Sequence, residues 1–112
     1  MALGAWAAHG LAWRLDPPAL AWIETGLRYQ GLHAVALIGV AGLMAIRPAW
    51  ALLFTTLAFA VGTLLFCGSL YALAFTGLRT LAFLTPIGGL AFLAGWAGIC
   101  WYGVSLRSNA RN

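Results

Sequence analysis

Apolar residues in this chain form long runs that short polar breaks separate. Runs such as 32–46 and 57–66 contain no charged residue. They also lack the strict apolar–polar alternation of strands in a membrane barrel. The hydrocarbon core of a bilayer is about 30 Å thick, so a helix needs about 20 apolar residues to cross it. Because backbone polar groups must be satisfied inside lipid, these runs predict an all-α membrane protein.

The breaks predict a four-helix transmembrane bundle with a shortened first helix. One transmembrane domain is expected over residues 1–112, with helices at about 2–13, 29–46, 49–75 and 85–106. The first run would reach only about 18 Å at 1.5 Å per residue. Between it and the second run, Leu20, Ile23 and Leu27 recur at spacings of three and four. That periodicity predicts a short interfacial helix in the first loop.

The helix boundaries follow from residues that stop or start helices. Pro48 disfavours helix at Arg47 and ends the second helix. Gly77 is a natural C-terminal stop for the third helix. Thr85 followed by Pro86 predicts an N-cap and a first turn for the fourth helix.

Composition supports a membrane solvent and excludes several classes of soluble protein. Hydrophobic residues make up 63% of the 112 residues, and charged residues make up 7%, against about 25% in a typical soluble domain. The net charge is +4, and all six basic residues are arginines. They lie near breaks or in the C-terminal tail, where arginine anchors helices at headgroups. We therefore expect the lipid bilayer as partner, and no nucleic acid.

Arginine positions also bear on orientation. In a four-pass bundle, one side receives Arg47, Arg107 and Arg111, and the other receives Arg14, Arg28, Arg79, Asp16 and Glu24. The arginine counts are equal, so the positive-inside rule decides weakly. We expect both termini in the cytoplasm.

Small residues recur four positions apart along the predicted helices. Helices in membranes associate through small residues that let their backbones approach closely. The glycines expected at helix contacts are Gly62, Gly68, Gly88, Gly89, Gly95 and Gly98. These positions predict either a tight bundle or a face that docks on another membrane protein.

Three stretches carry a family resemblance. They are Gly4 to Leu11 (GAWAAHGL), Tyr29 to Ala34 (YQGLHA), and the block from Phe66 to Trp96, which contains TPIGG and FLAGW. The chain resembles the small membrane proteins of domain of unknown function 423, a family with bacterial YgdD-type members and a eukaryotic transmembrane relative. The resemblance implies a four-helix, multi-pass protein of the bacterial inner (cytoplasmic) membrane with no established activity. Family members carry a longer apolar stretch before Ala-His-Gly-Leu, so the resemblance implies either a truncated first helix here or a true start further upstream.

The two histidines are the sharpest candidates for a site. His9 and His33 are expected at one membrane depth, because one ends the first helix and the other begins the second. Ionisable residues in membrane segments are functional candidates by default. The ligand or lipid pocket candidates are His9, His33, Ser69, Tyr71, Thr85 and Arg79. The plainer interpretation is that these polar groups form hydrogen bonds between helices.

Few cofactors fit this residue set. Two histidines could hold one haem between them. No third His, Asp or Glu within a membrane segment completes a transition-metal site, so no metal is expected. Haem remains a minor alternative to having no cofactor.

Three functions remain open, and an enzyme is not expected because no catalytic set appears. The first is a structural or accessory subunit that packs against a larger membrane complex. The second is a module that binds a lipid, a quinone or haem at the His9/His33 end. The third is a minimal channel or transporter, which a partial polar row on the third helix would suggest. That row comprises Thr55, Thr56, Thr63 and Ser69.

Overall fold

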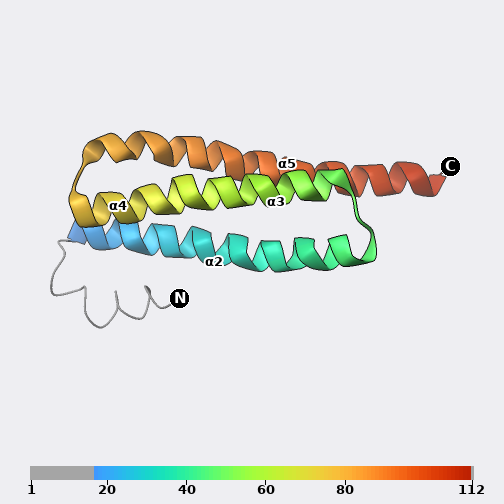
Figure 1. Ribbon diagram of the computed structural model, residues 1–112, viewed down its shortest axis with the longest axis horizontal. Coiled ribbons are helices and arrows are strands. Elements are labelled where there is room, and N and C mark those ends of the chain that lie inside the picture. The colour runs from blue at the N-terminus through green and yellow to red at the C-terminus, as the bar shows by residue number, and fades with distance from the viewer. Residues whose placement is uncertain (1–16, 112) are drawn as a thin grey trace.

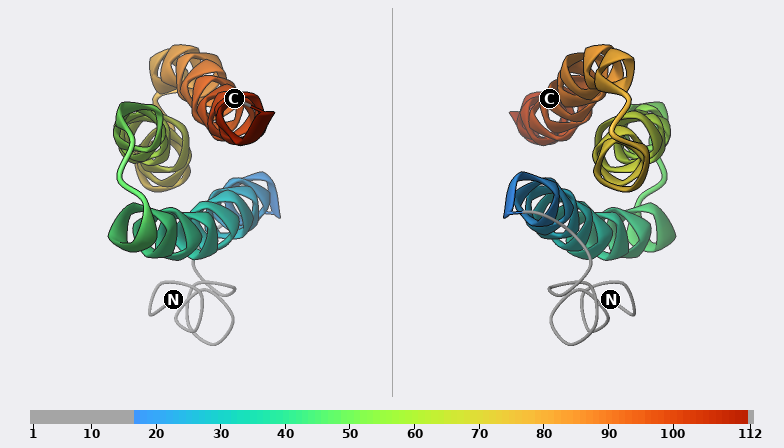
Figure 2. Two further views of the ribbon diagram at one scale, coloured as in Figure 1. Left: turned by 90° about the vertical axis from the view of Figure 1, so that its right-hand side faces the viewer. Right: turned by 90° about the vertical axis from the view of Figure 1, so that its left-hand side faces the viewer.

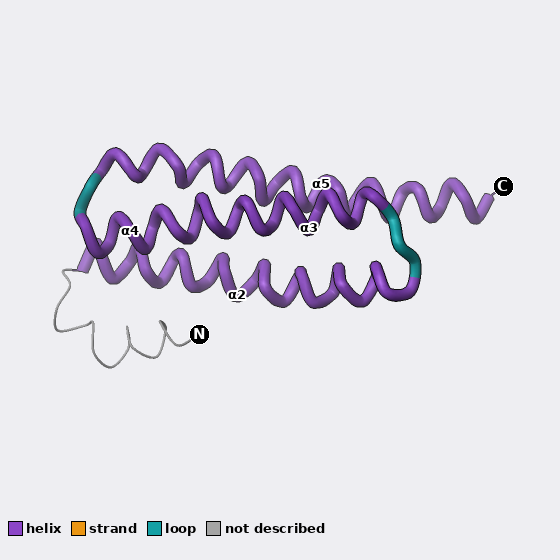
Figure 3. Tube along the Cα trace, in the orientation of Figure 1, coloured by secondary structure: helices purple, strands orange, loops and turns teal. Residues whose placement is uncertain are grey.

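The computed structural model describes residues 17–111 and is all helix apart from two short connections (Figures 1 and 3). The elements are α2 (Pro17–Ile46), α3 (Trp50–Gly62), the π-helix η2 (Thr63–Cys67), α4 (Gly68–Thr76), the 3₁₀-helix η3 (Arg79–Phe83) and α5 (Leu84–Arg111). They form three continuous helical segments long and apolar enough to cross a membrane. The described residues therefore hold three such segments, not four. The predicted first helix over 2–13 lies outside them.

Helix α2 runs unbroken through the predicted interfacial segment, so the separate helix expected in the first loop is wrong. Its interior contains no proline, and the two prolines at its start occupy the first turn, where they are tolerated. The stripe that suggested an interfacial helix is the inner face of one long helix. Ile23 on that stripe is fully buried, next to Ala74 of α4. The helix ends at Ile46, as Pro48 predicts.

The second segment consists of α3, η2 and α4 in one continuous rod over Trp50–Thr76. It ends where Gly77 takes a left-handed conformation with φ 70°, as the sequence predicts. Within the rod, Thr63–Cys67 widens into one π turn. Such π turns are rare, and they occur frequently at functional sites.

Helices α2 and α5 lie on opposite flanks of this second segment (Figure 2). Helix α5 packs along α3 and η2, whereas α2 packs mainly against α4. The backbones of the flanking helices α2 and α5 come close at few positions. The described residues therefore leave a groove between them.

Glycines set the close approach of α5 to the second segment. A Cβ added to Gly88 would collide with the backbone of Phe66. A Cβ on Gly95 would collide with the ring of Phe59, and one on Gly98 would collide with the hydroxyl of Thr55. These contacts explain why the helices need residues without side chains there.

The other predicted packing glycines differ in their surroundings. Gly62 faces the ring of Phe92. Gly89 has only Phe66 nearby, at 3.9 Å from an added Cβ. Gly68 is exposed, with no described atom within 4 Å of an added Cβ, so it makes no helix contact within the described residues. Gly68 lies on the outer face of the rod, directly after the π turn, and periodicity alone did not reveal which face it would take.

Candidate functional site

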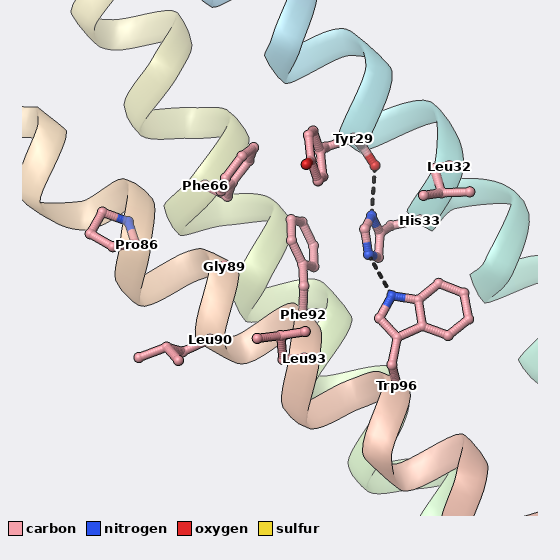
Figure 4. Close-up of a pocket in the computed structure, with 10 residues that line it drawn as sticks. All are labelled: Tyr29, Leu32, His33, Phe66, Pro86, Gly89, Leu90, Phe92, Leu93 and Trp96. Atoms are coloured by element: carbon pink, nitrogen blue, oxygen red, sulfur yellow. Dashed lines mark hydrogen bonds between the residues drawn. The ribbon is translucent and has the colours of Figure 1, made fainter.

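A cavity of about 520 Å³ occupies the groove between α2 and α5 (Figure 4). Helix α2 supplies one wall, the N-terminal half of α5 supplies the other, and the π turn contributes Phe66. The lining residues are Tyr29, Leu32, His33, Phe66, Pro86, Gly89, Leu90, Phe92, Leu93 and Trp96. The lining is almost wholly apolar and aromatic.

His33 lies at the base of this cavity and is only 2% exposed. Trp96 donates its indole N–H to Nε2 of His33 at 3.1 Å. Because Nε2 accepts this bond, the ring proton is on Nδ1, which donates to the carbonyl of Tyr29 at 2.8 Å. His33 is therefore a neutral imidazole with both nitrogens engaged.

Aromatic rings surround this imidazole on several sides. Phe92 stacks on it with ring centroids 3.7 Å apart. Phe59 meets it edge-on at 5.0 Å. An uncharged, fully hydrogen-bonded ring is the form that such apolar surroundings favour. A metal or haem iron could bind His33 only after one of its two hydrogen bonds broke.

Two other predicted residues form a separate contact between α4 and α5. Ser69 donates to the carbonyl of Phe66 at 2.9 Å, and its oxygen lies 2.6 Å from the hydroxyl of Thr85. Thr85 is not an N-cap as predicted, because η3 leads directly into α5 and that helix begins at Leu84. The Thr85 hydroxyl instead links two helices.

Tyr71 forms a third contact, between α4 and α2. Its hydroxyl donates to the side-chain oxygen of Gln30 at 2.6 Å, and its ring lies against Gly26. Arg79 is exposed at the start of η3 and does not line the cavity. His9 lies outside the described residues. Among the candidates within residues 17–111, Ser69, Thr85 and Tyr71 thus form separate helix–helix contacts, and only His33 lines the cavity.

Three of the four residues in the polar row predicted on the third helix, Thr55, Thr56 and Ser69, bond backbone carbonyls. Thr55 is fully buried and donates to the carbonyl of Gly95 on α5 at 3.0 Å. Thr56 donates to the carbonyl of Leu52 within its own helix. These hydroxyls join or cap backbone carbonyls and do not line an open path.

Sequence reasoning did not predict the aromatic part of the site. Tyr29, Phe66 and Phe92 read as ordinary apolar or interfacial positions. Trp96 offered one signal: its indole N–H is a donor deep in a membrane helix, and a buried donor requires an acceptor. His33 was an available acceptor at a comparable depth. The π turn that positions Phe66 has no recognisable sequence signature.

Comparison with known proteins identifies the family of this chain. The family model described as "Protein of unknown function (DUF423)" matches residues 3–89. The chain belongs to this family. The "UPF0382 inner membrane protein YgdD" of Escherichia coli (strain K12) is 46% identical over 97 residues, covering 87% of this chain and 74% of the relative. A "UPF0382 membrane protein" of Haemophilus influenzae is 46% identical over 101 residues, covering 90% and 81%.

A more distant member comes from Staphylococcus haemolyticus. This UPF0382 membrane protein is 42% identical over 98 residues, covering 83% of this chain and 75% of its own. No solved structure is significantly similar to the chain. Relatives named as inner membrane proteins and three membrane-length helices together make this DUF423 protein a multi-pass protein of the inner membrane.

The charges of this DUF423 protein mark its two membrane faces. Arg47, Arg107 and Arg111 lie at the end that holds the α2–α3 connection and the C-terminus. Arg79 lies at the opposite end, and Glu24 and Arg28 lie in the N-terminal half of α2, away from Ile46. Tyr29 is about 26 Å along α2 from Ile46, at about 1.5 Å per residue. The cavity therefore belongs to the membrane half next to Arg28 and Arg79.

Residues 17–111 contain no group of three His, Cys, Asp or Glu side chains that could hold a metal ion. Cys67 is buried and Cys100 is exposed, and both are free thiols. The site therefore offers shape, aromatic surface and hydrogen-bonding groups. Binding of an apolar molecule is the chemistry that such a lining supports best.

Proposed function

We propose that this DUF423 protein binds one membrane lipid in the cavity between α2 and α5. The observation that carries the proposal is the cavity itself, which opens between two helices that the described chain leaves uncovered. Its deep polar groups, His33 and Trp96, satisfy each other. The base of the cavity therefore has no unpaired polar side chain and presents an apolar surface to a bound molecule.

The lining favours an acyl chain over the helix of another protein. Helices in membranes pack closely where both partners present small residues. Gly89 is the only small residue in this lining, and the walls are formed by Phe66, Phe92 and Trp96 with branched leucines. Bulky rings leave irregular space that a flexible chain can follow.

The length of the cavity also matches one leaflet. Along α5 the lining extends from Pro86 to Trp96, which is about 15 Å at 1.5 Å per residue. Half of a hydrocarbon core of about 30 Å has the same depth. A lipid with its head near Tyr29 would place its chain tail beside Trp96.

An accessory role remains a second candidate, which a different surface favours. A cleft of about 360 Å³ between α3 and α5 has Ala51, Ala97 and Gly98 along it and is flanked by Trp50, Phe54 and Trp101. Small residues between exposed aromatic side chains suit the helix of a partner membrane protein. Recovery of one fixed partner with the native protein, and its loss on the substitution Ala97→Leu at an exposed position of this cleft, would support this role.

Filling the cavity tests the lipid-binding proposal. Gly89→Leu would place a branched side chain inside it, and the nearest described atom to a new Cβ is 3.9 Å away. Gly42→Leu is the matched control, because Gly42 is an exposed glycine in α2 with no described atom within 4 Å of an added Cβ. Native mass spectrometry from mild detergent would count the lipids that each variant retains.

We expect one tightly held lipid in the wild type and in Gly42→Leu, and none in Gly89→Leu. Equal retention by all three proteins would contradict the proposal. Circular dichroism would check that both variants keep the helical content of the wild type.

A further inference from the structure

We infer that the lipid in this cavity is an ester-linked diacyl glycerolipid, and that the Tyr29 hydroxyl donates a hydrogen bond to one of its ester carbonyls. This inference rests on the proposed function and specifies the polar part of the ligand. It comes from the one polar group of the lining that the described chain leaves without a partner.

Three lining side chains carry polar atoms, and two of them are paired. Trp96 and His33 are hydrogen-bonded to each other, and the second nitrogen of His33 bonds the carbonyl of Tyr29. The Tyr29 hydroxyl makes no hydrogen bond with any described residue, although Tyr29 lines the cavity and is 40% exposed. A lipid that fills the cavity would displace water from this hydroxyl, at a cost in free energy. An acceptor supplied by the ligand would recover it.

The ring of Tyr29 is held in place while its hydroxyl stays available. It packs on Phe66 with centroids 4.6 Å apart and lies nearly parallel to Phe92 at 6.2 Å. Figure 4 shows these three rings close to one another, each from a different helical element. A fixed donor loses little conformational entropy on binding, so it can discriminate between acceptors.

The depth of Tyr29 identifies the acceptor. The residue lies about 26 Å along α2 from Ile46, close to the full hydrocarbon thickness of about 30 Å. The preceding residue is Arg28, an exposed charge. Tyrosine at this level keeps its ring in the hydrocarbon and its hydroxyl at the polar boundary. In a glycerolipid, that boundary is where the ester carbonyls lie.

A prenylquinone fits this donor set less well. Its flat ring carries two carbonyls on opposite sides, and each would take a donor. The described lining has one free donor, because both nitrogens of His33 are engaged. An ester carbonyl needs one donor only, and its two chains can follow the apolar walls.

The test compares two lipids that differ only in the carbonyl. Delipidated protein would be titrated with a diacyl phosphatidylethanolamine and with its dialkyl ether analogue of equal chain length. Native mass spectrometry would measure the bound fraction. We expect the wild type to prefer the ester lipid about fivefold, the factor that one neutral hydrogen bond supplies. In Tyr29→Phe we expect the preference to vanish. Both lipids should then bind with the affinity that the wild type has for the ether lipid.

Tyr102→Phe is the control, because it also removes a tyrosine hydroxyl, but at the opposite end of the bundle, where Tyr102 bonds the carbonyl of Arg47. It should keep the ester preference. Equal binding of ester and ether lipid by the wild type, a preference that survives Tyr29→Phe, or displacement of both by a prenylquinone would overturn the inference. These outcomes differ from failure of the proposed function, in which Gly89→Leu would retain lipid as well as the wild type does.

Discussion

The indole nitrogen of Trp96 lies 3.1 Å from Nε2 of His33, a residue 63 positions earlier in the chain and on a different helix. Indole nitrogen can only donate, so this bond fixes the tautomer of the imidazole. It also joins α2 to α5, together with the stacking of Phe92 on the imidazole. The pair thus closes the base of the cavity and holds its two walls at a set distance.

The costs of removing each partner of this bond alone should add up to more than the cost of removing both together. Trp96→Phe leaves a buried acceptor on His33 without a donor, and we expect a loss of about 1–2 kcal/mol in the free energy of unfolding. A double-mutant cycle with His33→Leu should give a coupling energy of about 0.5–1.5 kcal/mol. Unfolding by steric trapping in bicelles would measure it. Strictly additive effects would show that the two side chains do not interact.

The same Gly→Ala change should have opposite effects at Gly88 and Gly68. At Gly88 the new methyl group meets the backbone of Phe66, and we expect a loss of about 1–3 kcal/mol because a backbone cannot move aside cheaply. At Gly68 no described atom is close, and alanine should be neutral or should stabilise by up to about 1 kcal/mol. Thermal unfolding in one detergent would compare them. Equal destabilisation would contradict the helix contacts described above.

Much of the fold can be predicted from the sequence, because the bilayer requires long apolar helices with polar breaks between them. Pro48 and Gly77 end helices where expected. The apolar run between these two residues and the run from Gly77 to the C-terminus both form membrane-length helices. The prediction of an interfacial helix was wrong for a physical reason. A stripe of period 3.6 looks the same whether it faces a membrane surface or another helix, and here Ile23 faces α4.

The candidate site was less predictable than the fold. His33 could be singled out because a histidine inside a membrane helix is rare. Its pairing with Trp96 depends on how α5 is rotated about its axis, which periodicity alone does not reveal. The π turn at Thr63–Cys67 shifts the register of the second segment, also without a sequence signal. Ser69 and Tyr71 were expected beside His33, but each faces a different neighbouring helix.

The geometry of His33 bears on the haem alternative. Both of its nitrogens take part in hydrogen bonds, so coordination of iron would require the loss of the Trp96 bond. We expect protein purified in mild detergent to show no Soret absorption, with or without added haemin. A Soret band that His33→Ala abolishes would contradict this prediction and restore haem as a ligand.

The C-terminus should lie in the cytoplasm. Arg47, Arg107 and Arg111 share one end of the described bundle, and the only acid in the described residues, Glu24, lies in the N-terminal half of α2, away from that end. Arginines close to helix ends are retained on the cytoplasmic side. A C-terminal fusion to green fluorescent protein should therefore fluoresce, and one to alkaline phosphatase should be inactive. The reverse pattern would place the cavity in the opposite leaflet.

The most direct test of lipid binding uses Trp96 as a reporter inside the cavity. A variant that keeps Trp96 as its only tryptophan would be delipidated in detergent and titrated with a phospholipid brominated along its acyl chain. We predict quenching that saturates near one lipid per protein, and loss of that saturable phase when Gly89→Leu is added. Quenching that rises in proportion to the lipid fraction, equally in both proteins, would contradict a bound lipid between α2 and α5.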